Sequence, residues 1–103
     1  MKTFAENLNV LPTLDGLTTL RLLDAHGAPL AVIENKPGTQ GSFRVYHFVA
    51  NKCGSLGPEA AREALELYAE HTDDARQHPG KHPNIDRLFE IVEKNLRYTV
   101  QAS

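Results

Sequence analysis

This sequence has little cysteine, no tryptophan and no long apolar run. Cys53 is the one cysteine among its 103 residues, so an internal disulfide is excluded, and small secreted domains usually depend on several. No apolar run approaches the roughly 18 residues of a membrane-spanning helix. The first residues contain Glu6, Asn7 and Asn9, which would interrupt the apolar core of a signal peptide. We therefore expect a cytoplasmic protein that does not bind membranes.

An excess of charge of either sign is also missing. The chain has 11 Lys and Arg against 13 Asp and Glu, a net charge of −2. Nucleic acid is therefore an unexpected partner, because no strong positive field would attract it. The 41% hydrophobic and 23% charged residues are ordinary for a globular protein, and the length suffices for one hydrophobic core. We expect one domain over residues 1–103.

The N-terminal segment predicts a short helix over about residues 4–10. Thr3 and Glu6 have the spacing of a capping box, in which each side chain bonds the backbone of the other residue. Pro12 favours the end of the helix just before it.

Three strands are predicted next, because the apolar residues then alternate with a period of two. Residues 17–24 and 30–35 flank the turn residues 25–29, as in a hairpin. Residues 42–49 give the strongest strand signal, with one predicted face formed by Phe43, Val45, His47 and Val49 and the other by Arg44, Tyr46 and Phe48. Short loops between these segments predict an antiparallel meander.

The second half of the chain predicts two helices and a last strand. One helix begins at Pro58 and ends near His78, and the second covers about residues 84–95. The second helix has an apolar stripe of Ile85, Leu88, Phe89, Val92 and Leu96. In residues 96–100, apolar and polar side chains alternate again, which predicts the last strand. The predicted fold is α+β: a mostly antiparallel four-stranded sheet (the three-strand meander plus the C-terminal strand), two amphipathic helices packed on one face, and a short N-terminal helix.

A histidine-rich segment at the end of the first long helix is the candidate metal site. Its potential ligands are His71, Asp74, His78 and His82. The first three lie at i, i+3 and i+7 of a helix, so they share one side, and Zn or Ni suits such imidazole and carboxylate ligands. Asp73 or Glu70 is the expected second-shell carboxylate or general base. The competing interpretation is structural, because histidines at a helix end also bond the last carbonyls and no established metal motif is present.

Two lysines lie in loops that suit ligand or partner contact. Lys36 opens the segment 36–42, whose backbone donors suit an anion, although it does not match the phosphate-binding loop of nucleotide hydrolases. A similar segment, 52–55, leads into a helix N-terminus. Lys81 lies in a stiff loop between Pro79 and Pro83, where a charge is either solvated or a contact point.

The strongest predicted strand supplies the remaining candidates. Arg44 and Tyr46 share its outer face, where they are expected to contact a ligand or partner, unless Tyr46 belongs to the core. His47 is expected on the core face, partly buried, with a ligand role as the alternative. Cys53 follows His47 by six residues, but a lone cysteine is usually an inert small apolar residue.

Two segments resemble a known family. The residues 33–38 (IENKPG) and 78–86 (HPGKHPNID) are similar to those of short bacterial proteins classed as a domain of unknown function. The resemblance extends over nearly the whole chain. It implies a small bacterial stand-alone domain and brings no assigned activity, cofactor or catalytic residue.

The function expected from these patterns is that of a non-enzymatic binding or protein-interaction module. The partner is an unknown protein or a second copy of the chain, since a sheet edge can pair across a two-fold axis to give a homodimer. The alternative is a divalent-metal-binding protein or metal-dependent enzyme that uses the segment from His71 to His82. A third hypothesis is a small-anion or nucleotide site at residues 36–42. No catalytic signature decides whether the protein is an enzyme.

Overall fold

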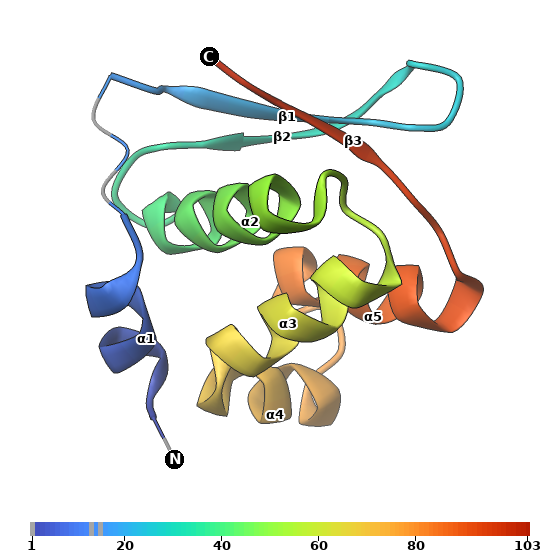
Figure 1. Cartoon of the computed structure of the whole chain (residues 1–103). Helices are drawn as coiled ribbons and strands as arrows, with labels where there is room; N and C mark the ends of the chain where they lie inside the picture. Colours follow the sequence, from blue (N-terminus) through green and yellow to red (C-terminus); the bar gives the residue numbers. More distant parts are fainter. Residues whose placement is uncertain (1, 13, 15) are drawn as a thin grey trace.

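The computed structural model describes residues 2–12, 14 and 16–103, in which a small sheet lies above a group of helices (Figure 1). The helices are α1 (Phe4–Val10), α2 (Gln40–Cys53), α3 (Pro58–Tyr68), α4 (Glu70–Gln77) and α5 (Pro83–Lys94). The strands are β1 (Thr19–Leu23), β2 (Pro29–Glu34) and β3 (Thr99–Ala102). The predicted α+β class is confirmed.

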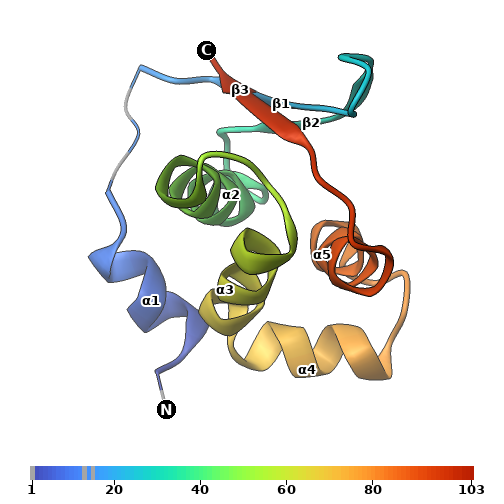
Figure 2. The ribbon, with the colours of Figure 1, turned by 45° about the vertical axis from the view of Figure 1, so that its right-hand side comes forward.

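The sheet is antiparallel, with the strands in the order β2-β1-β3. Leu20 pairs with Ile33, and Leu22 pairs with Val100. Both leucines are fully buried, because alternate side chains of β1 point toward the helices. Figure 2 shows the labelled helices on this one side, so no described element covers the other face of the sheet.

Helix α2 connects the sheet to the rest of the core. It runs beneath the strands, and α3 lies on its far side (Figures 1 and 2). Its buried residues are Phe43, Val45, Tyr46, Val49 and Ala50. Helix α5 packs mainly against α3. The prediction that two late helices cover the sheet is therefore wrong: α2 is its main cover.

The predicted third strand, residues 42–49, is wrong because these residues belong to α2. Its alternating apolar residues also fit a helix, since Phe43, Tyr46 and Ala50 lie at i, i+3 and i+7. In a strand, Phe43 and Tyr46 would point to opposite faces, whereas in a helix they lie on the same side. Both are buried, so the helical period of 3.6 residues applies here and not the strand period of two. The described sheet consequently has three strands and not four.

The predicted single helix from Pro58 to His78 is two helices. The chain breaks at Ala69, whose φ of 52° is outside the helical region, and α4 then leaves in a new direction. No glycine or proline marks this position, which explains why the pattern of the sequence did not predict it.

Other elements agree with the sequence. The capping box of Thr3 and Glu6 is formed at α1, and the 19–34 hairpin is present. The C-terminal strand exists but is displaced, from residues 96–100 to Thr99–Ala102. None of the helices in the described ranges has the length and apolar character that crossing a bilayer requires.

Candidate functional site

A groove of about 590 Å³ opens where the N-terminal ends of α2 and α5 meet α1 and the end of α3. Its basic residues are His71, Lys81 and His82. No aspartate or glutamate of residues 2–12, 14 and 16–103 lines it. The groove therefore unites two segments that the sequence analysis treated separately, the donor-rich loop before α2 and the histidine-rich segment after α3.

The first turn of α2 faces this groove without a side-chain cap. Thr39 occupies the N-cap position, but its hydroxyl donates to the carbonyl of Glu34 at 2.6 Å. The amide of Gln40 already donates to the carbonyl of Lys36 at 2.8 Å, so the amides of Gly41 and Ser42 are the first-turn donors that favour an acceptor from outside the helix. Gly41 lets α1 approach closely, because a Cβ atom there would lie 2.9 Å from Cζ of Phe4.

Two hydroxyl groups meet on the wall of the groove. Tyr68, which is 3% exposed, donates from its hydroxyl to Oγ of Ser42 at 2.6 Å. Burial raises the pKa of Tyr68, so the phenol stays protonated and remains a donor. Because Oγ of Ser42 accepts this bond, the proton of the Ser42 hydroxyl can be donated to a ligand.

Asp74 contacts two of the three basic residues that line the groove. Its Oδ2 lies 2.6 Å from Nε2 of His82 and 3.0 Å from Nζ of Lys81. Hydrogen bonds from His82 and then Lys81 lower the pKa of Asp74 from 3.8 to about 2, so it remains a carboxylate. His78 is more distant, with Nε2 at 3.8 Å from Oδ1.

Aromatic rings form the apolar wall. Phe4 stacks on Tyr68 with ring centroids 5.2 Å apart and meets the ring of His71 edge-on at 5.0 Å. The rings of His71 and His82 lie 5.8 Å apart. The groove thus has a basic, donor-rich end and an aromatic side.

The predicted metal ligands are partly brought together. Asp74 contacts His82, approaches His78, and also bonds the ammonium group of Lys81. Within the described part of the chain, no three His, Cys, Asp or Glu side chains are arranged to hold a metal ion.

The residues predicted from the third strand lie outside the groove. Arg44 donates to the carbonyls of Leu11 at 2.9 Å and Pro12 at 3.3 Å and holds the end of α1 in place. Tyr46 is fully buried: its hydroxyl donates to the carbonyl of Asn84 and accepts from Arg87. Both side chains therefore have hydrogen-bond partners within the protein.

The other predicted contacts are also dispersed. His47 is half-buried, stacks near Phe43, and lines a small hollow of about 280 Å³ below β3. Lys36 is exposed and pairs with Glu34 at 2.9 Å. Cys53 is exposed at the end of α2.

Tyr68 is a groove residue that the sequence analysis did not select, and Ser42 was included only as the last residue of the donor-rich segment 36–42. Ser42 was also expected to begin a strand, and Tyr68 lies within the helix predicted from Pro58. A buried tyrosine hydroxyl needs a hydrogen-bond partner, and this requirement is the available sequence signal for Tyr68. Its partner comes from a distant segment, so the pair itself was not predictable.

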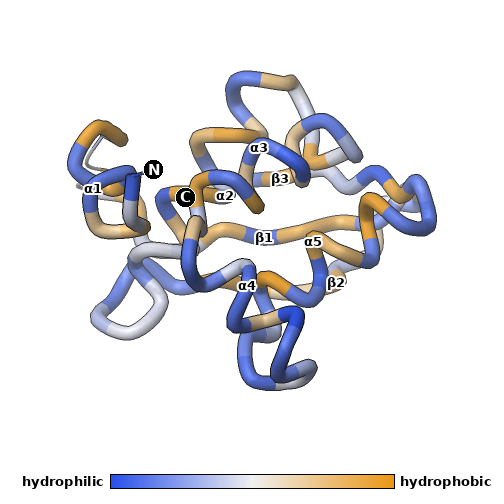
Figure 3. The backbone as a smooth tube through the Cα atoms, turned by 90° about the horizontal axis from the view of Figure 1, so that it is seen from below, coloured by the Kyte–Doolittle hydropathy of each residue, from blue (hydrophilic) through white to orange (hydrophobic). Residues whose placement is uncertain are grey.

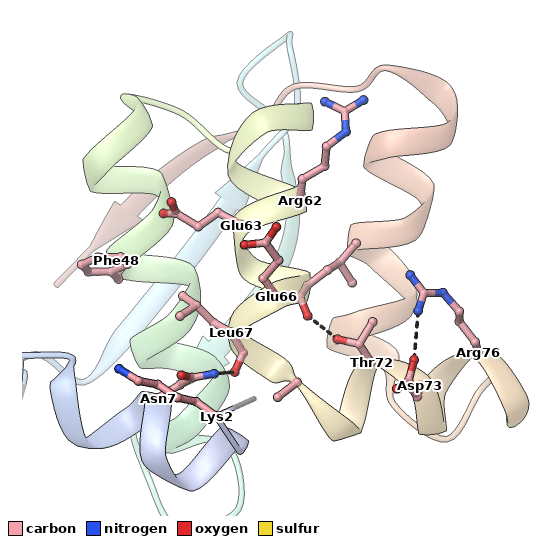
Figure 4. Close-up of a pocket in the computed structure, with 12 residues that line it drawn as sticks. Lys2, Asn7, Phe48, Arg62, Glu63, Glu66, Leu67, Thr72, Asp73 and Arg76 are labelled. Carbon is pink, nitrogen blue, oxygen red and sulfur yellow. Dashed lines mark hydrogen bonds and ion pairs between the residues drawn. The ribbon is translucent and has the colours of Figure 1, made fainter.

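A larger hollow of about 730 Å³ follows α3 (Figure 4). Its charged residues are Lys2, Arg62, Arg76, Glu63, Glu66 and Asp73. Figure 4 shows Arg76 directed at Asp73, with their atoms 3.1 Å apart. Glu63 pairs with Lys52 at 2.6 Å. Positive and negative groups are equal in number here, so this hollow favours neither sign of ligand.

The sequence profile of one protein family matches residues 4–102. The family, DUF2322, is described as an uncharacterized protein conserved in bacteria. The match confirms the resemblance noted for residues 33–38 and 78–86. No curated protein and no solved structure matches the chain.

Proposed function

Because the chain belongs to DUF2322, a bacterial family whose description assigns no activity, we propose a function from the groove itself. The protein is a non-enzymatic binding module that takes a small anionic ligand, carrying a phosphate or carboxylate group, between the N-terminal ends of α2 and α5.

The charge of the groove lining carries this proposal. Lys81, His71 and His82 line it and no described carboxylate does. The N-terminal end of a helix carries a partial positive charge, and two such ends border the same space. The side chain of Ser42 and the backbone amides of Gly41 and Ser42 are the expected hydrogen-bond donors to the anion.

The remaining part of the ligand is expected to be apolar or aromatic. The groove exceeds the size of a phosphate ion, and ligand sites usually measure about 300–1,000 Å³. Phe4, Tyr68 and Ile85 offer an apolar surface beside the donors. Inorganic phosphate alone would therefore occupy only part of the site.

Thermal unfolding with added ligands tests the proposal. The probes are inorganic phosphate, adenosine monophosphate and citrate. A ligand at about ten times its Kd stabilises the native state by about 1.4 kcal/mol. For a domain of this size, that raises Tm by roughly 5 to 10 °C. Adenosine monophosphate should act at a lower concentration than phosphate.

Matched lysine variants distinguish groove binding from general charge attraction. Lys81→Gln should weaken binding by about tenfold or more, because it removes one charged donor. Lys36→Gln removes the same charge outside the groove and should leave binding unchanged. Equal effects of the two variants, or no Tm shift with any probe, would contradict the proposal.

A divalent metal at His71, Asp74, His78 and His82 is the alternative. It is supported by the contact of Asp74 with His82 and the approach of His78. The bond from Lys81 to the same carboxylate oxygen works against it, since a metal would have to displace the ammonium group. Calorimetric titration with Zn²⁺ and Ni²⁺ tests it. Stoichiometric binding lost in His71→Ala and His82→Ala would favour the metal.

A further inference from the structure

Asn84 is a groove residue whose side-chain amide has an orientation fixed by a neighbour. It is the second residue of α5 and follows a connection, residues 78–82, that is hydrophilic throughout (Figure 3). It lines the groove, and its Oδ1 accepts a hydrogen bond from Nη1 of Arg87 at 2.9 Å. A guanidinium group can only donate, so the carboxamide oxygen must face Arg87 and the NH2 group must point away from it.

The buried Tyr46 holds the same two residues in place. Its hydroxyl donates to the backbone carbonyl of Asn84 and accepts from Nη1 of Arg87, the latter at 3.2 Å. The guanidinium of Arg87 also lies 5.8 Å from the centre of the Tyr46 ring. Both oxygens of Asn84 are therefore bonded within the protein, so the side chain is held in position before a ligand binds.

The NH2 group of Asn84 is left as a donor on the groove side. Arg87 lines a separate hollow of about 390 Å³, whereas Asn84 lines the groove, so the two ends of the carboxamide are directed at different spaces. The side-chain amides of Asn7 and Asn35 differ, because they donate to backbone carbonyls. The NH2 group of Asn84 has no such acceptor among residues 2–12, 14 and 16–103.

With Asn84, the groove has more donors than one carboxylate group can accept. From α2 come the amides of Gly41 and Ser42 and the hydroxyl of Ser42, and from α5 comes the NH2 group of Asn84. Lys81 adds an ammonium group, of which one N–H is directed at Asp74, at 3.0 Å. A carboxylate has two oxygens for these donors, whereas a phosphomonoester has three strong acceptor oxygens and nearly twice the charge.

We propose that the groove selects a small phosphomonoester over a carboxylate, and that Asn84 donates to the phosphate oxygen that a carboxylate lacks. This inference rests on the anion site proposed above and narrows its ligand class. Ser42 and the amides of α2 bind the phosphate from one wall, and Asn84 binds it from the other, because α2 and α5 both border the groove. Arg87 is a positioning residue that keeps the NH2 group of Asn84 turned toward the ligand.

Two ligands with the same ring and a similar charge test the selection. Phenyl phosphate carries one phosphate group and phthalate carries two carboxylates, so each has a charge of about −2 near pH 7.5. In calorimetric titration, phenyl phosphate should bind at least about tenfold more tightly than phthalate. Lys81→Gln should weaken the binding of both, because it removes a charge that attracts either anion.

Variants of Asn84 and Arg87 test the assigned roles. Asn84→Ala removes the NH2 group and should lower the affinity for phenyl phosphate by about tenfold, with less than about threefold change for phthalate. Asn51→Ala makes the same change on α2 away from the groove and should alter neither affinity. Arg87→Lys retains a donor to Oδ1 and should keep the preference for phosphate, whereas Arg87→Met removes that donor and should reduce the preference.

NMR of the side-chain amides tests the contact in the unmodified protein. The NH2 resonances of Asn84 should shift when phenyl phosphate is added. Those of Asn35 should not shift, because its NH2 group donates to the carbonyls of Leu14 and Leu17. This measurement decides the role of Asn84 even if a variant does not fold.

The possible results separate this inference from the proposed function. Equal affinities for the two ligands, both reduced in Lys81→Gln, would leave the anion site in place and overturn its selectivity. A preference for phenyl phosphate that Asn84→Ala does not change, or NH2 resonances of Asn84 that the ligand does not shift, would overturn the role of Asn84. Binding of neither ligand at about 10 mM, well above a weak Kd of about 1 mM, would contradict both proposals.

Discussion

The groove between α2 and α5 and the hollow along α3 are both large enough for a small molecule, at about 590 and 730 Å³. They differ in how their charges are arranged. The cations of the hollow are matched by carboxylates in the same lining, among them Arg76 with Asp73. In the groove, Asp74 bonds Lys81 and His82 but is not itself part of the lining.

This difference is the reason why we propose the groove, and not the hollow, as the ligand site. Side chains already held in position lose little conformational entropy when a ligand binds. Asp74 holds His82, whose side chain is 24% exposed, and Tyr68 holds Ser42 before any ligand arrives. In the hollow, ions such as Asp73 and Arg76 are exposed and paired with each other, which contributes little to stability and leaves no excess charge. Size alone would select the hollow, whereas the arrangement of polar groups favours the groove.

A carboxylate placed in the groove should remove the difference in charge between the groove and the hollow. In Ser42→Asp, the new side chain lies in the first turn of α2 and occupies the position proposed for the anion. We expect the affinity for adenosine monophosphate to fall by about a hundredfold, equivalent to about 2.7 kcal/mol. The fold should persist, because an acidic residue is favourable in the first turn of a helix and its oxygen can accept the bond from Tyr68. Calorimetry and circular dichroism measure the two properties.

Asn51→Asp is the control for that variant. It adds the same charge to the same helix, near the other end and away from the groove, so ligand affinity should stay within about twofold of the original protein. A hundredfold loss in both variants would mean that overall charge, and not the groove, governs binding.

The hollow depends on the break between α3 and α4, and Ala69 at that break also lines it. Its φ of 52° and ψ of −116° are strained for alanine but accessible to glycine. Ala69→Gly should therefore stabilise the protein by about 0.5 to 1 kcal/mol, seen as a higher urea midpoint. In contrast, Ala5→Gly on the exposed side of α1 should cost about 1 kcal/mol. A loss of stability in Ala69→Gly would show that the break carries no strain.

Ala69 also illustrates why the fold was only partly predictable. Helix α5, the capping box of α1 and the first hairpin follow from local patterns, and the structure confirms them. The break at Ala69 and the helical state of residues 42–49 depend on packing. Tyr46 is buried and its hydroxyl donates to the carbonyl of Asn84 in α5, which favours the helical period over the strand period, and local alternation contains no information about that contact.

The candidate site was likewise predictable only where its residues are close together in the sequence. Lys81, His82 and Asp74 are close in sequence, and the structure brings them together. The loop before α2 joins them only through the fold, so the sequence analysis led to two separate hypotheses, a metal site and an anion site, for two segments that border one groove. Arg44 and Tyr46 were selected on a strand face that does not form, and both have internal partners instead.

The contribution of Asp74 to the stability of the native state depends on pH. Its pKa of about 2 lies below the ordinary value of 3.8, so its contribution to native stability is complete above pH 3.8 and is lost as the pH falls toward 2. His82 is the main cause of the lowered pKa and Lys81 the next. We therefore expect His82→Ala to raise the pKa of Asp74 toward 3.8, and Lys81→Gln to raise it less. Carbon NMR of the side-chain carboxyl group measures this titration, and an unchanged value in His82→Ala would show that the imidazole does not hold Asp74 in solution.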